Sequence, residues 1–183
     1  MPRIPTPATI DAAPAAAQPL LNAVKASLGS VPNLFRLESA SPAALEGHLA
    51  LNSALDKGEL DDATRERIAL AIANINGCTY CNSAHTYLAT NIAKLSNAEI
   101  VANRAGGSTD PKADAAVKFA VKVARERGRV SDDDFRQLKL AGYSDGQAVE
   151  IVAHVALNTL TNYINEAFKT DVDFPVVEAV RAA

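Results

Sequence analysis

The chain has 183 residues, of which 48% are hydrophobic and 21% are charged, and its formal net charge is −3. This length suits one domain with a sizeable core, and the charge gives no indication of binding to nucleic acid or to an anionic membrane. No apolar run approaches the ~18 residues that span a bilayer, and the first residues lack the apolar core of a signal peptide.

The first residues differ in composition from the rest of the chain. Residues 1–19 are rich in proline and alanine, so we expect an extended arm, with a short turn at most, that precedes a single domain over residues 20–183. In an oligomer such an arm would lie across a neighbouring copy. The apolar spacing over residues 20–28 predicts a helix that Gly29 ends.

Two more helices are predicted before residue 60. Asn33 is a suitable N-cap for a short helix that runs through Leu37, and Ser41, followed by proline, begins a longer helix that ends near Gly58. His48 lies on the longer helix. No partner for its imidazole is evident from the sequence, so we interpret His48 as a partly exposed helix residue.

The stretch from Glu66 to His85 contains both cysteines of the chain. Two acidic residues at positions 61 and 62 begin a helix whose apolar positions recur with helical spacing, and Asn76-Gly77 ends it. A second helix is predicted from about Cys78 to Leu95. Both cysteines then lie in its first turn, on neighbouring parts of one face, and His85 follows one turn later.

This arrangement has chemical consequences for the two thiols. Free N–H groups and the positive end of the helix dipole lower the pKa of a thiol at a helix start, and a thiolate attacks peroxides and disulfides far better than a thiol does. A sulfenic acid formed at one sulfur needs a second thiol to condense with, which Cys78 and Cys81 together provide. His85 is placed to take a proton from Cys81, and a carboxylate could orient that imidazole. The sequence therefore predicts a redox-active dithiol.

Other interpretations of the same residues stay open at this point. Two cysteines in an intracellular protein can be small buried hydrophobic residues without chemistry. Cys78, Cys81, His85 and Glu66 also offer the sulfur, nitrogen and oxygen donors of a four-ligand zinc site. Against zinc, metal ligands usually come as two separated pairs, and the chain has no second pair. We therefore expect no bound metal and no cofactor.

The remainder of the chain is also helical in pattern. Ser96 and Glu99 form a capping-box pattern for a short helix that ends near Gly106. Further helices are predicted from about 110 to 128, from 131 to 142 and from 144 to about 168. No useful strand alternation appears, so the predicted fold class is all-α.

A short internal repeat links two of these helices. Residues 66–74 align with residues 150–158, and the same register places Asn162 opposite Cys78 and Asn165 opposite Cys81. The match suggests a duplicated helical pair whose second copy has no thiols. His154 and Asn162 would line the pocket near the dithiol or, as we favour, satisfy each other or backbone groups.

The spacing Glu66-x11-Cys78-Thr-Tyr-Cys81-x3-His85 resembles that of the alkylhydroperoxidase D-like proteins of the carboxymuconolactone decarboxylase superfamily. The likeness extends over roughly residues 29–175 and includes Val31-Pro-Asn-Leu-Phe35 and Asp173-Phe-Pro175, which look like the peroxidase-related branch. One position departs from the family pattern, because Tyr80 stands where the best-studied members have a second histidine.

The resemblance implies a multihelical bundle and a thiol-dependent alkyl hydroperoxide reductase with an antioxidant role. It implies that Cys81 attacks the peroxide, that Cys78 resolves the product, and that Glu66 and His85 form the proton relay. The expected partners are a hydroperoxide, an external dithiol reductant and further copies of the chain, as trimers or hexamers. A redox cysteine pair without a signal peptide points to the cytosol. The alternatives are a dithiol–disulfide oxidoreductase or redox sensor, and a helical protein with structural cysteines.

Overall fold

Helix α4 (Asp62–Ile75) lies at the centre of a group of four other helices that pack against it. The computed structural model describes residues 1–180, and within them it contains helices and no strand, which confirms the all-α prediction. The helices other than α4 are η1 (Ile10–Ala12), η2 (Ala15–Ala17), α1 (Gln18–Leu28), α2 (Asn33–Glu38), α3 (Pro42–Leu55), α5 (Thr79–Asn91), α6 (Asn97–Arg104), α7 (Pro111–Arg125), α8 (Asp132–Leu140) and α9 (Asp145–Phe168).

The sequence of α4 explains its central position. The Asp61 side chain accepts a hydrogen bond from the Thr64 N–H at 2.6 Å, which caps the first turn. From Ile68 to Ala73 every residue is buried, so the helix is apolar on nearly all sides and contacts α5, α6, α7 and α9. Its alanines let these neighbours approach closely.

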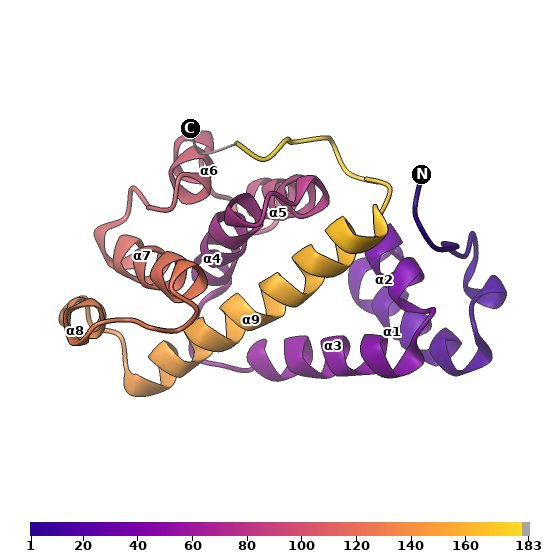
Figure 1. Cartoon of the computed structure of the whole chain (residues 1–183), viewed down its shortest axis with the longest axis horizontal. Coiled ribbons are helices and arrows are strands. Elements are labelled where there is room, and N and C mark those ends of the chain that lie inside the picture. Colours follow the sequence, from indigo (N-terminus) through magenta and orange to yellow (C-terminus); the bar gives the residue numbers. More distant parts are fainter. Residues whose placement is uncertain (181–183) are drawn as a thin grey trace.

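Helix α9 crosses the molecule diagonally (Figure 1). It packs against α2 and α3 on one side and against α4, α5 and α7 on the other, so it connects the N-terminal helices with the later ones. Ser144 and Gln147 form a capping box at its start. One turn later, the Glu150 carboxylate accepts hydrogen bonds from the N–H groups of Glu59 and Leu60 at 2.9 and 3.0 Å, just before α4 begins. Helices α4 and α9 therefore start side by side.

None of the helices described over residues 1–180 combines the length and the apolar character that spanning a membrane requires.

At both ends of the described residues, 1–180, the chain packs on its own helices. In the arm, Ala13 and Ala17 are buried against α1 and α3, and the Arg3 N–H donates to the Phe168 carbonyl at 2.7 Å. The arm is therefore folded into two short 3-10 turns, where the sequence predicted an extended segment. Because the whole arm is rich in proline and alanine, its composition gave no sign that Ala13 and Ala17 pack as core residues.

The C-terminal segment, residues 169–180, turns back after α9 and runs in extended form over α5 towards α6 (Figure 1). The Asp173 carboxylate accepts the Asn33 N–H at 2.9 Å, and near the end the Val180 N–H donates to the Asn74 side chain at 2.8 Å. Contacts at its two ends therefore hold this segment across the α4–α5 helical pair.

Most helix starts were predicted correctly because their caps are local. Ser41, Asp61, Ser131 and Ser144 each accept a hydrogen bond from the third following residue. The prediction for Asn33 was wrong, since Pro32 is the cap and the Asn33 side chain donates to the Asp171 carbonyl at 3.0 Å. The helix after the cysteines ends at Asn91, before the predicted Leu95.

His48 is the clearest error of the sequence interpretation. Only 5% of it is exposed, and its Nδ1 lies 2.7 Å from a carboxylate oxygen of Glu38, which is also buried. The Phe35 ring stacks on the imidazole with the ring centroids 5.4 Å apart. The partner comes from the preceding helix, α2, so spacing along α3 gave no sign of it.

Glu99 is half of the predicted capping box. Ser96 caps α6 as expected, but the Glu99 carboxylate turns inward instead of back to Ser96. It pairs with Arg67 Nε at 2.7 Å and accepts hydrogen bonds from Ser108 and Thr109 in the loop before α7. Burial on its own raises the pKa of Glu99, but the hydrogen bonds outweigh burial and lower the pKa to about 2.

We predict that Glu99→Gln makes the protein less stable at pH 6 and that this difference shrinks in acid. A carboxyl whose pKa falls on folding contributes stability above its unfolded value of 4.5, and the contribution disappears as the pH falls through about 2. The shift corresponds to about 3 kcal/mol. Urea unfolding at pH 6, 4, 3 and 2 measures it. The exposed Glu46→Gln variant should show no such trend. If the loss of unfolding free energy in Glu99→Gln stayed the same at every pH, Glu99 would not have the lowered pKa.

Candidate active site

The two cysteines lie where α4 reverses into α5. Gly77 adopts a left-handed conformation with φ of 70°, which a residue with a Cβ rarely takes, and so lets the chain turn between the helices. The Cys78 N–H donates to the Ala73 carbonyl at 3.0 Å. Cys78 is then the N-cap of α5, and Cys81 lies in its first turn, close to the predicted arrangement.

Cys78 and Cys81 are joined by a disulfide, with their Sγ atoms 2.20 Å apart. Cys78 Sγ also accepts the backbone N–H of Cys81 at 3.1 Å. In the reduced protein, this N–H and the start of α5 would stabilise negative charge at the sulfur position. The arrangement therefore joins two sulfurs that can exchange between dithiol and disulfide.

The disulfide is enclosed. Cys78 is 0% exposed and Cys81 is 3% exposed. Their apolar surroundings come from several elements, namely Leu34, Ala73, Tyr80, Ala84 and Ile164, together with Val172 and Phe174 of the C-terminal segment. The C-terminal segment, which runs along the edge of the molecule after α9 (Figure 1), contributes two of the residues that cover the sulfurs.

Glu66 and His85 are brought together across α4 and α5. A Glu66 carboxylate oxygen lies 3.0 Å from His85 Nδ1, and each side chain is about one fifth exposed, at 21% and 22%. In the tautomer that carries its proton on Nδ1, the imidazole donates to this carboxylate and Nε2 is left as the basic nitrogen. His85 lies one turn after Cys81 on α5, so the pair has the composition of a proton relay beside the dithiol.

Tyr80, the residue that departs from the family pattern, lies between the cysteines and the rest of the cover. Its hydroxyl accepts the Leu34 N–H at 3.2 Å, and the Phe174 ring meets it edge-on with the centroids 5.8 Å apart. Burial raises the pKa of Tyr80 far above its usual value, so the phenol stays neutral. Tyr80 therefore closes the site and carries no charge there.

Helix α9 forms the opposite wall of the site. The Asn165 amide Nδ2 lies 3.3 Å from Cys81 Sγ. Asn162 Oδ1 accepts a hydrogen bond from the Asn76 side chain at 2.9 Å, where we expected it to bond to His154 or to backbone groups. His154 is buried, and burial lowers its pKa. The sequence interpretation missed the Asn165 contact, although the internal repeat had already aligned Asn165 with Cys81.

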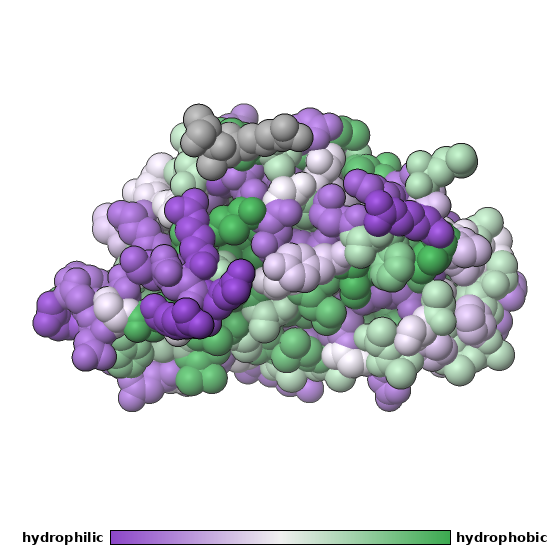
Figure 2. Space-filling model, viewed as in Figure 1, coloured by the Kyte–Doolittle hydropathy of each residue, from purple (hydrophilic) through white to green (hydrophobic). Residues whose placement is uncertain are grey.

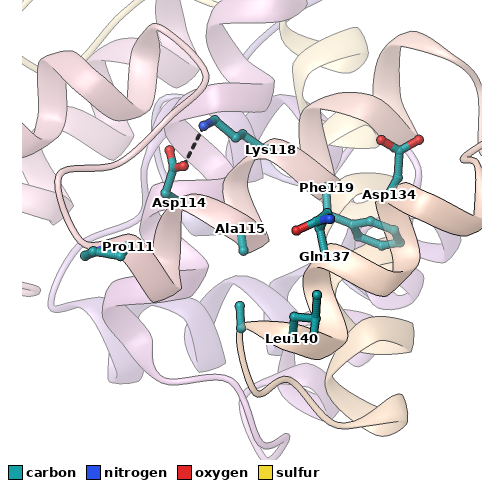
Figure 3. Close-up of a pocket in the computed structure, with 9 residues that line it drawn as sticks. Pro111, Asp114, Ala115, Lys118, Phe119, Asp134, Gln137 and Leu140 are labelled. Carbon is teal, nitrogen blue, oxygen red and sulfur yellow. Dashed lines mark ion pairs between the residues drawn. The ribbon is translucent and has the colours of Figure 1, made fainter.

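A separate hollow of about 510 Å³ lies between α7 and α8 (Figure 3). Its wall includes the Asp114–Lys118 ion pair, with 2.6 Å between the charged atoms. The lining residues come from α7, α8 and the turn after α8. The cysteine pair and the Glu66–His85 pair lie on other elements, so this hollow is distinct from the dithiol site.

No metal-ligand cluster is assembled in the part of the chain that the structure describes. Across residues 1–180 no group of three or more His, Cys, Asp or Glu side chains is arranged to hold a metal ion. The two sulfurs are bonded to each other, and the Glu66 carboxylate is bonded to the His85 imidazole.

Comparisons with known proteins identify a matching family and similar folds. Residues 42–126 match the carboxymuconolactone decarboxylase family. The solved structure of an uncharacterized peroxidase-related protein with an alkylhydroperoxidase AhpD core, from Ralstonia eutropha, is 27% identical, with a TM-score of 0.83 over 94% of this chain and 92% of that one. No protein of curated function matches the chain.

Two further structures share the fold at lower identity. A peroxidase-related protein from a Silicibacter species is 22% identical with a TM-score of 0.80, over 93% of this chain and 91% of that one. The debrominase Bmp8, with one cysteine replaced by alanine and in complex with 2,3,4-tribromopyrrole, is also 22% identical, with a TM-score of 0.72 over 92% and 90% of the two chains. Residues 42–126 therefore match the carboxymuconolactone decarboxylase family, and the chain as a whole is similar in fold to alkylhydroperoxidase D-like, peroxidase-related proteins.

Proposed function

We propose that the protein is a thiol-dependent hydroperoxide reductase. The observation that carries the proposal is the pairing of Glu66 with His85 beside a Cys78–Cys81 disulfide at the start of α5. This constellation combines a sulfur nucleophile, a second sulfur to resolve its oxidised form, and a base oriented by a carboxylate. The likeness to peroxidase-related proteins supports the same reaction class.

The first step forms the attacking sulfur. In the reduced protein, His85 Nε2 takes the proton of the Cys81 thiol, directly or through a water, while the Glu66 carboxylate stabilises the imidazolium. The Cys81 thiolate then attacks the terminal oxygen of a hydroperoxide. The S–O bond forms as the O–O bond breaks, Cys81 becomes a sulfenic acid, and the departing alkoxide takes a proton and leaves as an alcohol.

The second step restores a stable sulfur state. Cys78 attacks the sulfenic sulfur of Cys81, the S–S bond forms, and hydroxide leaves and is protonated to water. An external dithiol then returns two electrons and two protons by thiol–disulfide exchange. Because this cycle needs a reduced dithiol pool, we place it in a reducing compartment such as the cytosol.

Two other reactions compete with this assignment. A dithiol–disulfide oxidoreductase would use the same sulfurs and react poorly with peroxide. The debrominase Bmp8 shares the fold and was captured with a brominated pyrrole, so a reductive debromination is a second candidate. Parallel assays of hydroperoxide consumption, exchange with a small disulfide, and bromide release from 2,3,4-tribromopyrrole separate the three.

We also infer that the chain associates with copies of itself. Val152, Leu160 and Tyr163 on α9 are exposed, and together with α7 they line a mostly apolar groove of about 850 Å³. Hydrophobic surface lies along the face that α9 crosses (Figure 2). A second copy would bury this surface, in line with the trimers or hexamers that the family resemblance implies.

Cys81→Ser should abolish hydroperoxide turnover, because the hydroxyl of serine does not form the attacking anion at neutral pH. Cys78→Ser should keep the first step and stop after it, with a sulfenic acid at Cys81 that dimedone traps. Hydroperoxide consumption under dithiothreitol measures the first variant, and mass analysis of the dimedone adduct measures the second. Turnover at the wild-type rate in Cys81→Ser would show that another group reacts with peroxide.

Glu66→Gln should slow the oxidation of the reduced protein about 100-fold at pH 7 and leave the fold intact, since a neutral amide does not stabilise the imidazolium. The difference should narrow at high pH, where the thiolate forms without a base. Stopped-flow oxidation by cumene hydroperoxide from pH 6 to 10 measures it. The exposed Glu126→Gln variant serves as control, and equal rates for Glu66→Gln and wild type at pH 7 would remove Glu66 from the relay.

Phe174→Ala should speed reduction of the disulfide by dithiothreitol about 10-fold, because the ring packs in the cover of the disulfide. A tenfold change needs only about 1.4 kcal/mol of lost packing. Val176→Ala is the matched control, since Val176 lies on the same segment and is 64% exposed. Equal rates for both variants and the wild type would mean that the reductant enters by another route.

A further inference from the structure

The amide of Asn165 is the only side-chain group with a hydrogen bond to Cys81 Sγ in the described residues. Its Nδ2 lies 3.3 Å from the sulfur, across 84 positions of sequence, and Asn165 is itself only 2% exposed. Its Oδ1 is buried without a hydrogen-bond partner. Both sulfur and amide are therefore shielded from water.

The surroundings of Asn165 would favour an apolar residue if packing alone mattered. The cluster around the sulfurs contains Leu34, Ala73 and Ile164. A buried amide in such a place costs free energy unless its polar atoms are bonded, and here only the N–H group facing the sulfur is. An isosteric leucine would fill the same space without that cost. The amide is therefore explained by its contact with sulfur.

The two sulfurs receive different donors. Cys78 Sγ accepts the backbone N–H of Cys81, which any residue at that position would supply. This contact and the helix start favour negative charge on Cys78. Cys81 Sγ has the Asn165 amide as its donor. The side chain on α9 thus supplies Cys81 with the stabilisation that the helix start gives to Cys78.

We propose that Asn165 is a sulfur-binding residue of the dithiol site, whose amide N–H stabilises the Cys81 thiolate and thereby makes Cys81 the attacking sulfur. This inference rests on the proposed function, because it concerns which thiol of the redox pair reacts. The same N–H would stabilise Cys81 as the leaving thiolate when an external dithiol attacks Cys78 Sγ. Asn165 therefore acts in both halves of the cycle.

Several ionisable groups surround the sulfur and must be held constant in any test. They are Cys78, which caps α5, Tyr80 and His85 on α5, Glu66, which pairs with His85, and the charged Arg36 and Asp173, which act on Tyr80. A change at Asn165 alters none of these residues. A shift in the titration of Cys81 in an Asn165 variant then reports on the lost amide.

The experiment titrates Cys81 in the full-length Cys78→Ser protein, where serine keeps the helix cap and Cys81 is the single thiol. The protein carries 13Cβ-labelled cysteine, and the chemical shift of that carbon follows thiolate formation in the folded state. We expect Asn165→Leu to raise the titration midpoint by about one pH unit, as loss of one hydrogen bond to a charged group requires. Asn165→Asp should raise it further, because a carboxylate repels the thiolate.

Asn158→Leu is the matched control. Asn158 is a buried asparagine on the same helix, but its amide donates to the His154 carbonyl at 2.8 Å, so its loss should leave the midpoint unchanged. An unchanged midpoint in folded Asn165→Leu would overturn the proposal. If circular dichroism shows that Asn165→Leu does not fold, Asn165→Ala, which removes the amide without adding bulk or charge, decides by the same criterion.

The outcome separates this inference from the proposed function, since the titration uses no peroxide. An unchanged midpoint together with rapid oxidation of the wild-type thiols by hydroperoxide would reject the role of Asn165 and keep the reductase. A raised midpoint in a protein whose thiols resist hydroperoxide would keep the sulfur contact and reject the reductase.

Discussion

The reversal of the chain at Gly77 is the constraint on which the candidate site depends. It returns α5 along the buried α4, so that Cys78 caps the new helix and Glu66 meets His85 at 3.0 Å. A sulfur at a helix start and a carboxylate-oriented imidazole one turn away both follow from this single turn. Because α4 is buried on nearly all sides, the pair is held by the core of the protein.

Burial gives this site its chemical character. In a dry apolar cluster each hydrogen bond to sulfur counts for more than in water, and each unpaired polar atom costs more. The neutral Tyr80 and the edge-on Phe174 close the space over the disulfide. In the cycle that we propose, the same enclosure shields a sulfenic acid at Cys81 from a second peroxide molecule, and displacement of the C-terminal segment admits the reductant.

The sequence predicted those features that depend on neighbours along the chain. Helix starts at Ser41 and Asp61 follow from local capping. The pairing of Glu66 with His85 was implied by the family resemblance, and the two side chains do meet across α4 and α5. Features that depend on distant partners were missed. His48 pairs with Glu38, which lies on another helix, and the Asn165–Cys81 contact joins α9 to α5. Periodicity identifies a buried face but carries no information about which residue lies opposite.

The central claim is that a hydroperoxide converts the reduced pair into the Cys78–Cys81 disulfide. The most direct test is the intact mass of the reduced, metal-stripped protein before and after one equivalent of cumene hydroperoxide, with thiols counted by alkylation under denaturing conditions. We predict rapid loss of the mass of two hydrogens and of both thiols. Thiols that persist after treatment would contradict the account, and a zinc adduct in native spectra of unstripped protein would point to a structural site instead.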